Sequence, residues 1–224
     1  MKKPTRGEPF FYYFSIVLLL TVVLAFGLNI LLRNYHLDAS MPVIVTHGIS
    51  MLLWYSLFSW QTRLVRTGNI QVHMKLGLMS ILLAIVLVIS GILIAIGNFQ
   101  GEGEALTLFG NFSGMFLFGL FYTLAIINRK KPDIHKRLML VASVAMLSPA
   151  LVRILRIFDI NDFVTLPFWL IFILALPVYD FRKYGKVYKS TWMSIAFLLI
   201  LMFGGSAYAF SESWQTLAAS LFGR

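Results

Sequence analysis

Long apolar runs separated by short polar connections dominate the chain. A helix needs roughly 20 apolar residues to cross about 30 Å of hydrocarbon, and seven runs are of this length. None shows the period-two alternation of a membrane strand. The runs cover Phe10–Leu32, Pro42–Gln61, Met74–Gly97, Leu106–Asn128, Leu138–Phe158, Phe163–Phe181 and Thr191–Phe210. This pattern predicts an all-α membrane protein with seven transmembrane helices in a single domain, 1–224.

The composition excludes a soluble fold. Of the 224 residues 59% are hydrophobic and 12% are charged, against about 45–50% and about 25% in ordinary globular proteins. The formal charge of +10 would suggest nucleic acid in a soluble protein. In a membrane protein it indicates loops that face anionic lipid, so nucleic acid is not expected as a partner. The lipid bilayer is therefore the predicted partner, and a multi-pass position in a cell membrane the predicted location.

The basic residues predict the orientation. Fifteen of the 19 lysines and arginines fall at one set of helix ends, which leaves Arg33, Arg153, Arg156 and Arg224 at the other. Cytoplasmic loops carry the excess of Lys and Arg. The N-terminus is accordingly expected in the cytoplasm and the C-terminus outside.

An internal repeat is suggested by two histidine motifs. Aligning His73-Met-Lys-Leu-Gly with His135-Lys-Arg-Leu-Met brings two helical hairpins, about 42–97 and 106–158, into register. Both hairpins enter the membrane from outside, so a parallel repeat about an axis along the membrane normal is predicted. The alternative is two hairpins that share only generic interfacial residues.

The same residues carry a resemblance. Gln61, His73-x-x-Leu-Gly, Ser90-Gly91, His135-Lys-Arg-Leu-Met and Arg153 resemble a family of uncharacterised bacterial multi-pass membrane proteins with two His-Arg-type motifs. The resemblance covers roughly Thr46 to Arg156 and implies the repeat and the bacterial cytoplasmic membrane as the location. It implies no activity. Met-Lys follows His73 where that family has Arg and an aromatic residue.

His73 and His135 are the candidate metal ligands, because both open helices that enter from the predicted cytoplasmic face. Imidazole suits iron, so one hypothesis is a haem b held by both rings, with Lys75, Lys136 or Arg137 near its propionates. Under the competing interpretation, each His and the basic residues after it anchor a helix end among lipid headgroups.

A second candidate site lies toward the predicted outer face. His47, Trp54 and Gln61 share a stripe of the second span, and Arg153 is flanked by apolar residues in the fifth. Ionisable groups in a membrane face partners, water or a ligand. We therefore expect His47 and Arg153 to line an outward-facing cavity with Trp54 as a wall. A histidine bonded to a backbone carbonyl and a snorkelling arginine are the alternatives.

The remaining spans are expected to carry no functional polar residues. The sixth and seventh spans are almost uniformly apolar, no carboxylate is expected mid-span, and no broken helix of the transporter type is predicted. Asp38, Asp159, Glu102 and Glu104 are candidate partners for the outer arginines. The functional residues are thus expected within the four helices of the repeat.

Three functions fit these features. The first is a redox bundle that binds a haem or a quinone-like cofactor through His73, His135, His47, Arg153, Trp54 and Gln61. The second is a non-enzymatic subunit or scaffold that binds a lipid or a partner membrane protein. The third, a metal-dependent hydrolase, lacks a carboxylate ligand in the spans.

Overall fold

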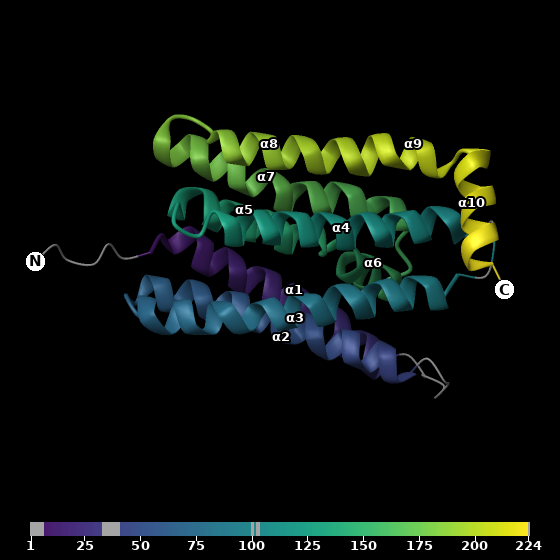
Figure 1. Ribbon diagram of the computed structural model, residues 1–224, viewed down its shortest axis with the longest axis horizontal. Helices are drawn as coiled ribbons and strands as arrows, with labels where there is room; N and C mark the ends of the chain where they lie inside the picture. The colour runs from purple at the N-terminus through teal and green to yellow at the C-terminus, as the bar shows by residue number, and fades with distance from the viewer. Residues whose placement is uncertain (1–6, 33–40, 100, 102–103, 224) are drawn as a thin grey trace, which may run out of the picture.

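The computed structural model describes residues 7–32, 41–99, 101 and 104–223, and these form a bundle of long helices (Figure 1). The helices are α1 (Pro9–Leu32), α2 (Met41–Arg66), α3 (Ile70–Gly97), α4 (Ala105–Ile127), α5 (Pro132–Ala145), α6 (Ser148–Ile157), α7 (Thr165–Tyr184), α8 (Lys189–Leu199), α9 (Gly205–Ala209) and α10 (Glu212–Phe222). Two short turns complete them, a 3₁₀ turn at Asp162–Val164 and a π turn at Ile200–Gly204.

The seven predicted spans are confirmed. Seven helical segments are long and apolar enough to cross a membrane, and each overlaps one predicted run. Several continue about one turn further than predicted at the end that carries the basic residues, for example to Arg66 and from Pro132. The apolar pattern stops where the hydrocarbon would stop, whereas the backbone hydrogen bonds continue through charged residues.

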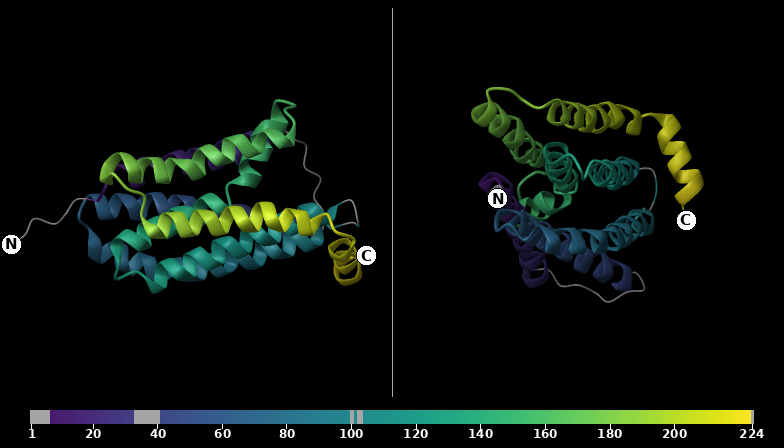
Figure 2. Two further views of the ribbon diagram at one scale, coloured as in Figure 1. Left: turned by 90° about the horizontal axis from the view of Figure 1, so that it is seen from above. Right: turned by 60° about the vertical axis from the view of Figure 1, so that its left-hand side comes forward.

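Neighbouring spans run antiparallel, and the short connections gather at two ends of the bundle (Figures 1 and 2). We call the end with the connections 67–69, 128–131 and 185–188 the basic end. The starts of α3 and α5 both lie there. The core centres on α2, α4 and α5, where Trp54, Phe118 and Tyr122 form edge-on and stacked ring contacts.

The fifth span is broken, contrary to the expectation of unbroken helices. α5 ends at Ala145 and α6 begins at Ser148, just before Pro149. Proline lacks an N–H and clashes with the carbonyl four residues earlier, so the helical ladder stops and carbonyls are released. The Tyr55 hydroxyl donates to the Ser143 carbonyl at 2.7 Å, and Trp169 Nε1 donates to the Val144 carbonyl at 2.9 Å. The donor from α2 thus satisfies a carbonyl at the break, whereas the donor from α7 adds a second bond to the Val144 carbonyl, which also accepts from the Leu147 amide at 3.1 Å.

The last helix, which was not predicted, lies across the end of the bundle opposite the basic end (Figure 1). Ser211 caps it by accepting a hydrogen bond from the Trp214 amide. The Trp214 indole donates to the Ala105 carbonyl at 2.8 Å, and Ala218 is fully buried. These contacts attach α10 to the first turn of α4.

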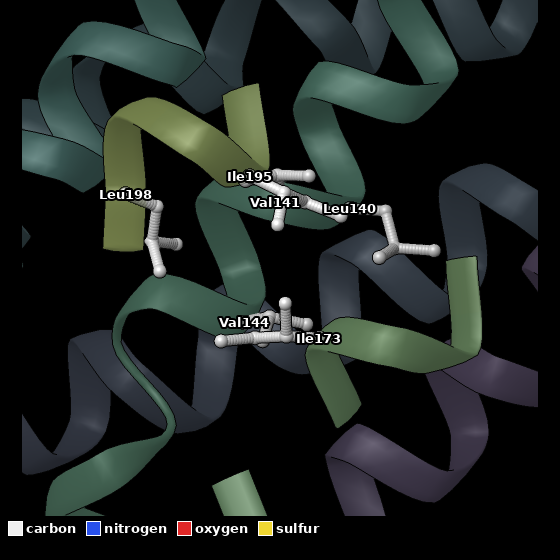
Figure 3. A pocket seen from close by; sticks show the side chains of 6 residues that line it. All are labelled: Leu140, Val141, Val144, Ile173, Ile195 and Leu198. Carbon is white, nitrogen blue, oxygen red and sulfur yellow. The ribbon is translucent and has the colours of Figure 1, made fainter. Parts of the chain in front are cut away.

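A small cavity lies between α5, α7 and α8 (Figure 3). Its volume is about 10 Å³ and its lining is apolar: Leu140, Val141, Val144, Ile173, Ile195 and Leu198. That is about the space of one water molecule, with no polar group to hold it. It is a packing defect and is too small for an organic cofactor.

The bond at the break gives a stability prediction. Replacing Tyr55, which is fully buried, with Phe leaves the Ser143 carbonyl unpaired in the core. We expect a loss of about 1–3 kcal/mol in the free energy of unfolding, measured by denaturant titration in detergent. The exposed Tyr208 supplies the control, because Tyr208→Phe should change stability little. Equal effects of the two substitutions would contradict this account of the break.

Candidate functional site

The two motif histidines come together at the basic end. His73 lies in the first turn of α3, which starts after a turn at Gly68 with φ of 82°, and His135 lies in the first turn of α5, which starts with Pro132. Proline favours the first turn of a helix. The ring centroids of the two imidazoles are 6.3 Å apart, and the ring planes are inclined by 82°. The structure therefore pairs side chains from two helices of the predicted repeat.

One of these imidazoles has a defined hydrogen-bond partner. His135 Nδ1 is 2.8 Å from the carbonyl oxygen of Ala125 in α4. A carbonyl only accepts, so Nδ1 must carry the proton, and in the neutral ring Nε2 then holds a free lone pair. This backbone contact orients the ring in the way that second-shell bonds orient metal-ligating histidines.

The other imidazole lies beside Gln61. The His73 imidazole is close to the main-chain carbonyl of Gln61, and a Cβ on Gly77, one turn beyond His73, would be 4.0 Å from Gln61 Nε2. Gln61 is 8% exposed. Within the described residues, neither its Nε2 nor its Oε1 has a hydrogen-bond partner, and nor does His73 Nδ1. Buried polar groups are normally paired, so this group of unpaired atoms stands out.

Trp54 lies in the core of the bundle. It is 1% exposed, and its indole Nε1 donates to Ser143 Oγ at 3.2 Å. Its ring contacts Tyr122, whose hydroxyl is bonded to Ser80 Oγ at 2.8 Å. Trp54 thus packs against α4 and α5, and its role as a wall between His47 and Arg153 stays a prediction.

His47 lies in the opposite half of the membrane span. Its Nδ1 is 3.1 Å from Ser90 Oγ, and its Cε1 would be 3.0 Å from a Cβ on Gly91. Ser90 donates to the Val86 carbonyl at 2.7 Å, so its single hydroxyl proton is already used. Nδ1 of His47 is therefore the donor to Ser90. The glycine is what allows this helix-to-helix contact.

The outer arginines have protein partners. Arg153 Nη1 donates to the Pro149 carbonyl at 3.0 Å, and its guanidinium lies over the Phe26 ring at 5.2 Å. It is close enough to influence His47 electrostatically. Arg156 forms an ion pair with Asp162, so its partner is not among the predicted candidates. Asp38 and Glu102 lie outside the described residues. A ligand site at His47 and Arg153 remains a prediction.

The main feature that sequence reasoning missed is a buried ion pair. Arg137 of α5 and Asp180 of α7 are both fully buried, with Arg137 Nη2 2.6 Å from Asp180 Oδ1. Thr191 Oγ1 donates to Asp180 Oδ2 at 2.6 Å, and the Tyr188 ring lies 3.6 Å from the guanidinium. Asp180 lies near the C-terminal end of α7, so the expectation of no carboxylate mid-span is not contradicted, but the description of the sixth span as almost uniformly apolar overlooked this acid. Asp180 as the sole acid between Thr165 and Tyr184 was the available signal.

A second acid, Glu8, joins α1 to α5 and α7. Lys136 Nζ and the Tyr179 hydroxyl each donate to Glu8 at 2.7 Å, and Tyr184 donates as well. Burial raises the pKa of this carboxyl, but the hydrogen bonds from Lys136, Tyr179 and Tyr184 outweigh burial and lower the pKa to about 2. Glu8 is therefore ionised at neutral pH.

These networks bear on the expected haem contacts. Lys136 and Arg137 were candidates for pairing with propionates, but Lys136 binds Glu8 and Asp133, and Arg137 binds Asp180. The structure therefore gives both cations partners in the chain itself and leaves Lys75 exposed. Among the described residues no three of His, Asp and Glu gather as a metal site, so the hydrolase interpretation gains no support.

No family model matches the chain, and searches of curated proteins and of solved structures found no match either. Functional inference therefore depends on the geometry of the site.

The buried ion pair gives a second stability prediction. Asp180→Asn removes the buried counter-charge of Arg137 and leaves only the exposed Asp133 carboxylate, 3.5 Å from Nη1; breaking a buried pair typically costs about 3–5 kcal/mol. We expect a large loss of stability in detergent, measured as unfolding by denaturant. Asp162→Asn, in the exposed pair with Arg156, is the control and should cost at most about 1 kcal/mol. A similarly small loss of unfolding free energy in both variants would contradict the view that the Arg137–Asp180 pair stabilises the packing of α5 against α7.

Glu8 gives a prediction for the pH dependence of stability. Its pKa is lowered from an ordinary 4.5 to about 2 in the folded protein, so it stabilises the fold fully above pH 4.5. This contribution should fade as the pH falls from 4.5 toward 2. As the pH falls through this range, the melting temperature of the native chain should decline. Glu8→Gln should melt at a lower temperature than the native chain at neutral pH, and its melting temperature should change less with pH. Parallel curves for the two proteins would show that Glu8 makes no such contribution.

Proposed function

We propose that this protein is a membrane electron-transfer bundle that binds haem b through His73 and His135. The observation that supports the proposal most strongly is the pairing of two half-buried imidazoles from α3 and α5 at 6.3 Å. Metal–nitrogen bonds of about 2.0–2.1 Å, with half a ring on each side, separate the centroids of two rings on one metal by roughly 6 Å. The measured separation agrees with this requirement.

The hydrogen bonding of His135 favours a metal over a quinone as the ligand. Its Nδ1 proton is directed to the Ala125 carbonyl, which leaves Nε2 as an acceptor. A quinone carbonyl is also an acceptor and gains nothing from such a nitrogen, whereas iron binds its lone pair.

His73 and His135 would hold the iron, and the haem would supply one-electron redox chemistry there. Such a centre is suited to electron transfer rather than to oxygen binding. The pair lies at the basic end, which the charge distribution predicts to face the cytoplasm, so electrons would enter or leave on that side. The protein would act in the bacterial cytoplasmic membrane with a quinone or a partner membrane protein as its redox partner.

The visible spectrum of the protein purified in detergent tests this proposal. We expect a sharp Soret band and a low-spin spectrum on reduction, and we expect His73→Ala and His135→Ala each to abolish or strongly weaken them. His36→Ala, a histidine outside the pair, is the matched control and should retain the spectrum.

Two results would count against a haem protein. One is a colourless protein that also fails to bind added hemin, and the other is hemin binding that survives both substitutions. The first would leave a non-enzymatic scaffold that binds a lipid or a partner membrane protein as the better interpretation.

A further inference from the structure

A histidine and a methionine from different helices meet over a glycine, in the half of the bundle away from the basic end. A Cβ placed on Gly91 of α3 would be 2.6 Å from Met115 Sδ of α4 and 3.0 Å from His47 Cε1 of α2. The thioether and the imidazole therefore lie against the same point on the surface of α3. Gly91 permits this approach, because a side chain at this position would push the two groups aside.

The hydrogen bonding of His47 leaves one imidazole nitrogen with a free electron pair. Its Nδ1 donates to Ser90 Oγ at 3.1 Å, since the Ser90 hydroxyl gives its own proton to the Val86 carbonyl. The Leu87 carbonyl, in the same part of α3, is a further acceptor for this N–H. In the neutral ring Nε2 then holds a lone pair, and Nε2 is bonded to Cε1, the atom that lies over Gly91 beside the sulfur.

The donor atoms and the charges around them favour a soft ion of low charge. Thioether sulfur is a ligand for Cu(I), and imidazole also binds copper. Neither ligand is charged, and Arg153 is the charged group that acts on His47. A guanidinium repels a divalent cation more strongly than a monovalent one. The pair therefore suits Cu(I) better than Cu(II) or Zn(II).

The place of His47 in the membrane span also indicates a ligand. Met115 is buried and His47 is half-buried, so the pair lies inside the protein and is reached past the imidazole. An ionisable side chain in a span is costly, and such residues mark binding sites and ion pathways. A contact that served packing alone would need sulfur beside an apolar or aromatic group and no imidazole lone pair.

We propose that His47 Nε2 and Met115 Sδ bind one Cu(I) ion between α2 and α4, over Gly91 of α3. The hydrogen bond from Nδ1 to Ser90 holds the imidazole in the tautomer that ligates the metal, as outer-shell contacts do for metal-bound histidines. This site goes beyond the proposed haem function and does not depend on it, because none of its residues belongs to the histidine pair at the basic end.

Titration of the haem-free protein with Cu(I) tests the site, carried out in detergent without oxygen and in competition with the chelator bicinchoninate. Met115→Leu keeps the volume of the side chain and removes the sulfur. We expect its Cu(I) affinity to fall by more than the about ten- to a hundredfold that loss of an outer-shell partner costs. Met193→Leu, at an exposed methionine of α8, is the matched control and should bind Cu(I) as the native chain does.

Gly91→Ala tests the geometry and leaves both ligands in the chain. Its Cβ would lie 2.6 Å from the Met115 sulfur, so the thioether and the imidazole must move from their shared position. The Cu(I) affinity should therefore fall as it does in Met115→Leu. Gly97→Ala, in the same helix, is the matched control, because a Cβ there has no described atom within 4 Å.

His47→Gln removes the nitrogen ligand and should also lose Cu(I), so the test does not depend on the folding of a single variant. His73→Ala should leave the affinity unchanged, which separates this site from the histidine pair. The proposal is wrong if the native chain binds no Cu(I), or if Met115→Leu and His47→Gln retain the native affinity. Equal affinities of Gly91→Ala and Gly97→Ala, or loss of Cu(I) from His73→Ala, would also overturn it. Each of these results leaves the hemin titration, and with it the proposed function, unaffected.

Discussion

Every polar group inside the hydrocarbon region must find its partner within the protein, and this constraint governs the structure. Helices satisfy their own backbone, which is why seven of them span the bundle. Where Pro149 interrupts the fifth span, the Tyr55 and Trp169 side chains donate hydrogen bonds to the Ser143 and Val144 carbonyls at the break. Where charges enter the spans at the basic end, Arg137 and Asp180 neutralise each other. The polar contacts therefore fix which helices can be neighbours.

Against this background the unpaired atoms gain significance. Among the described residues five buried side-chain atoms lack partners, and three of them belong to Gln61 and His73. The other two are hydroxyls of Thr165 and Ser190, in the first turns of α7 and α8. The unpaired atoms thus concentrate beside the one place where two imidazoles meet. Buried polar atoms without partners lower the stability of the fold, and departures of this kind from the usual rules are typical of functional sites.

The sequence predicted what depends on local pattern and missed what depends on tertiary pairing. Run lengths located all seven spans, and the two histidine motifs directed attention to side chains that lie together. Asp180 escaped notice because a lone acid near a helix end reads as interfacial, and only the fold brings Arg137 to it. The break at Pro149 was missed because its signal is one residue in an apolar run. Helical spacing placed Trp54 on the face of His47 but could not give its bond to Ser143, because spacing identifies a face and not the neighbouring helix.

Electron paramagnetic resonance of the oxidised protein tests the central claim most directly, because it reports both the number and the orientation of the iron's ligands. The imidazole planes of His73 and His135 are inclined by 82°. Two nearly perpendicular imidazoles on ferric haem predict a low-spin signal of large anisotropy. A high-spin signal, which indicates a missing axial ligand, or a low-spin signal that persists without His135 would contradict the assignment of this pair as the haem site.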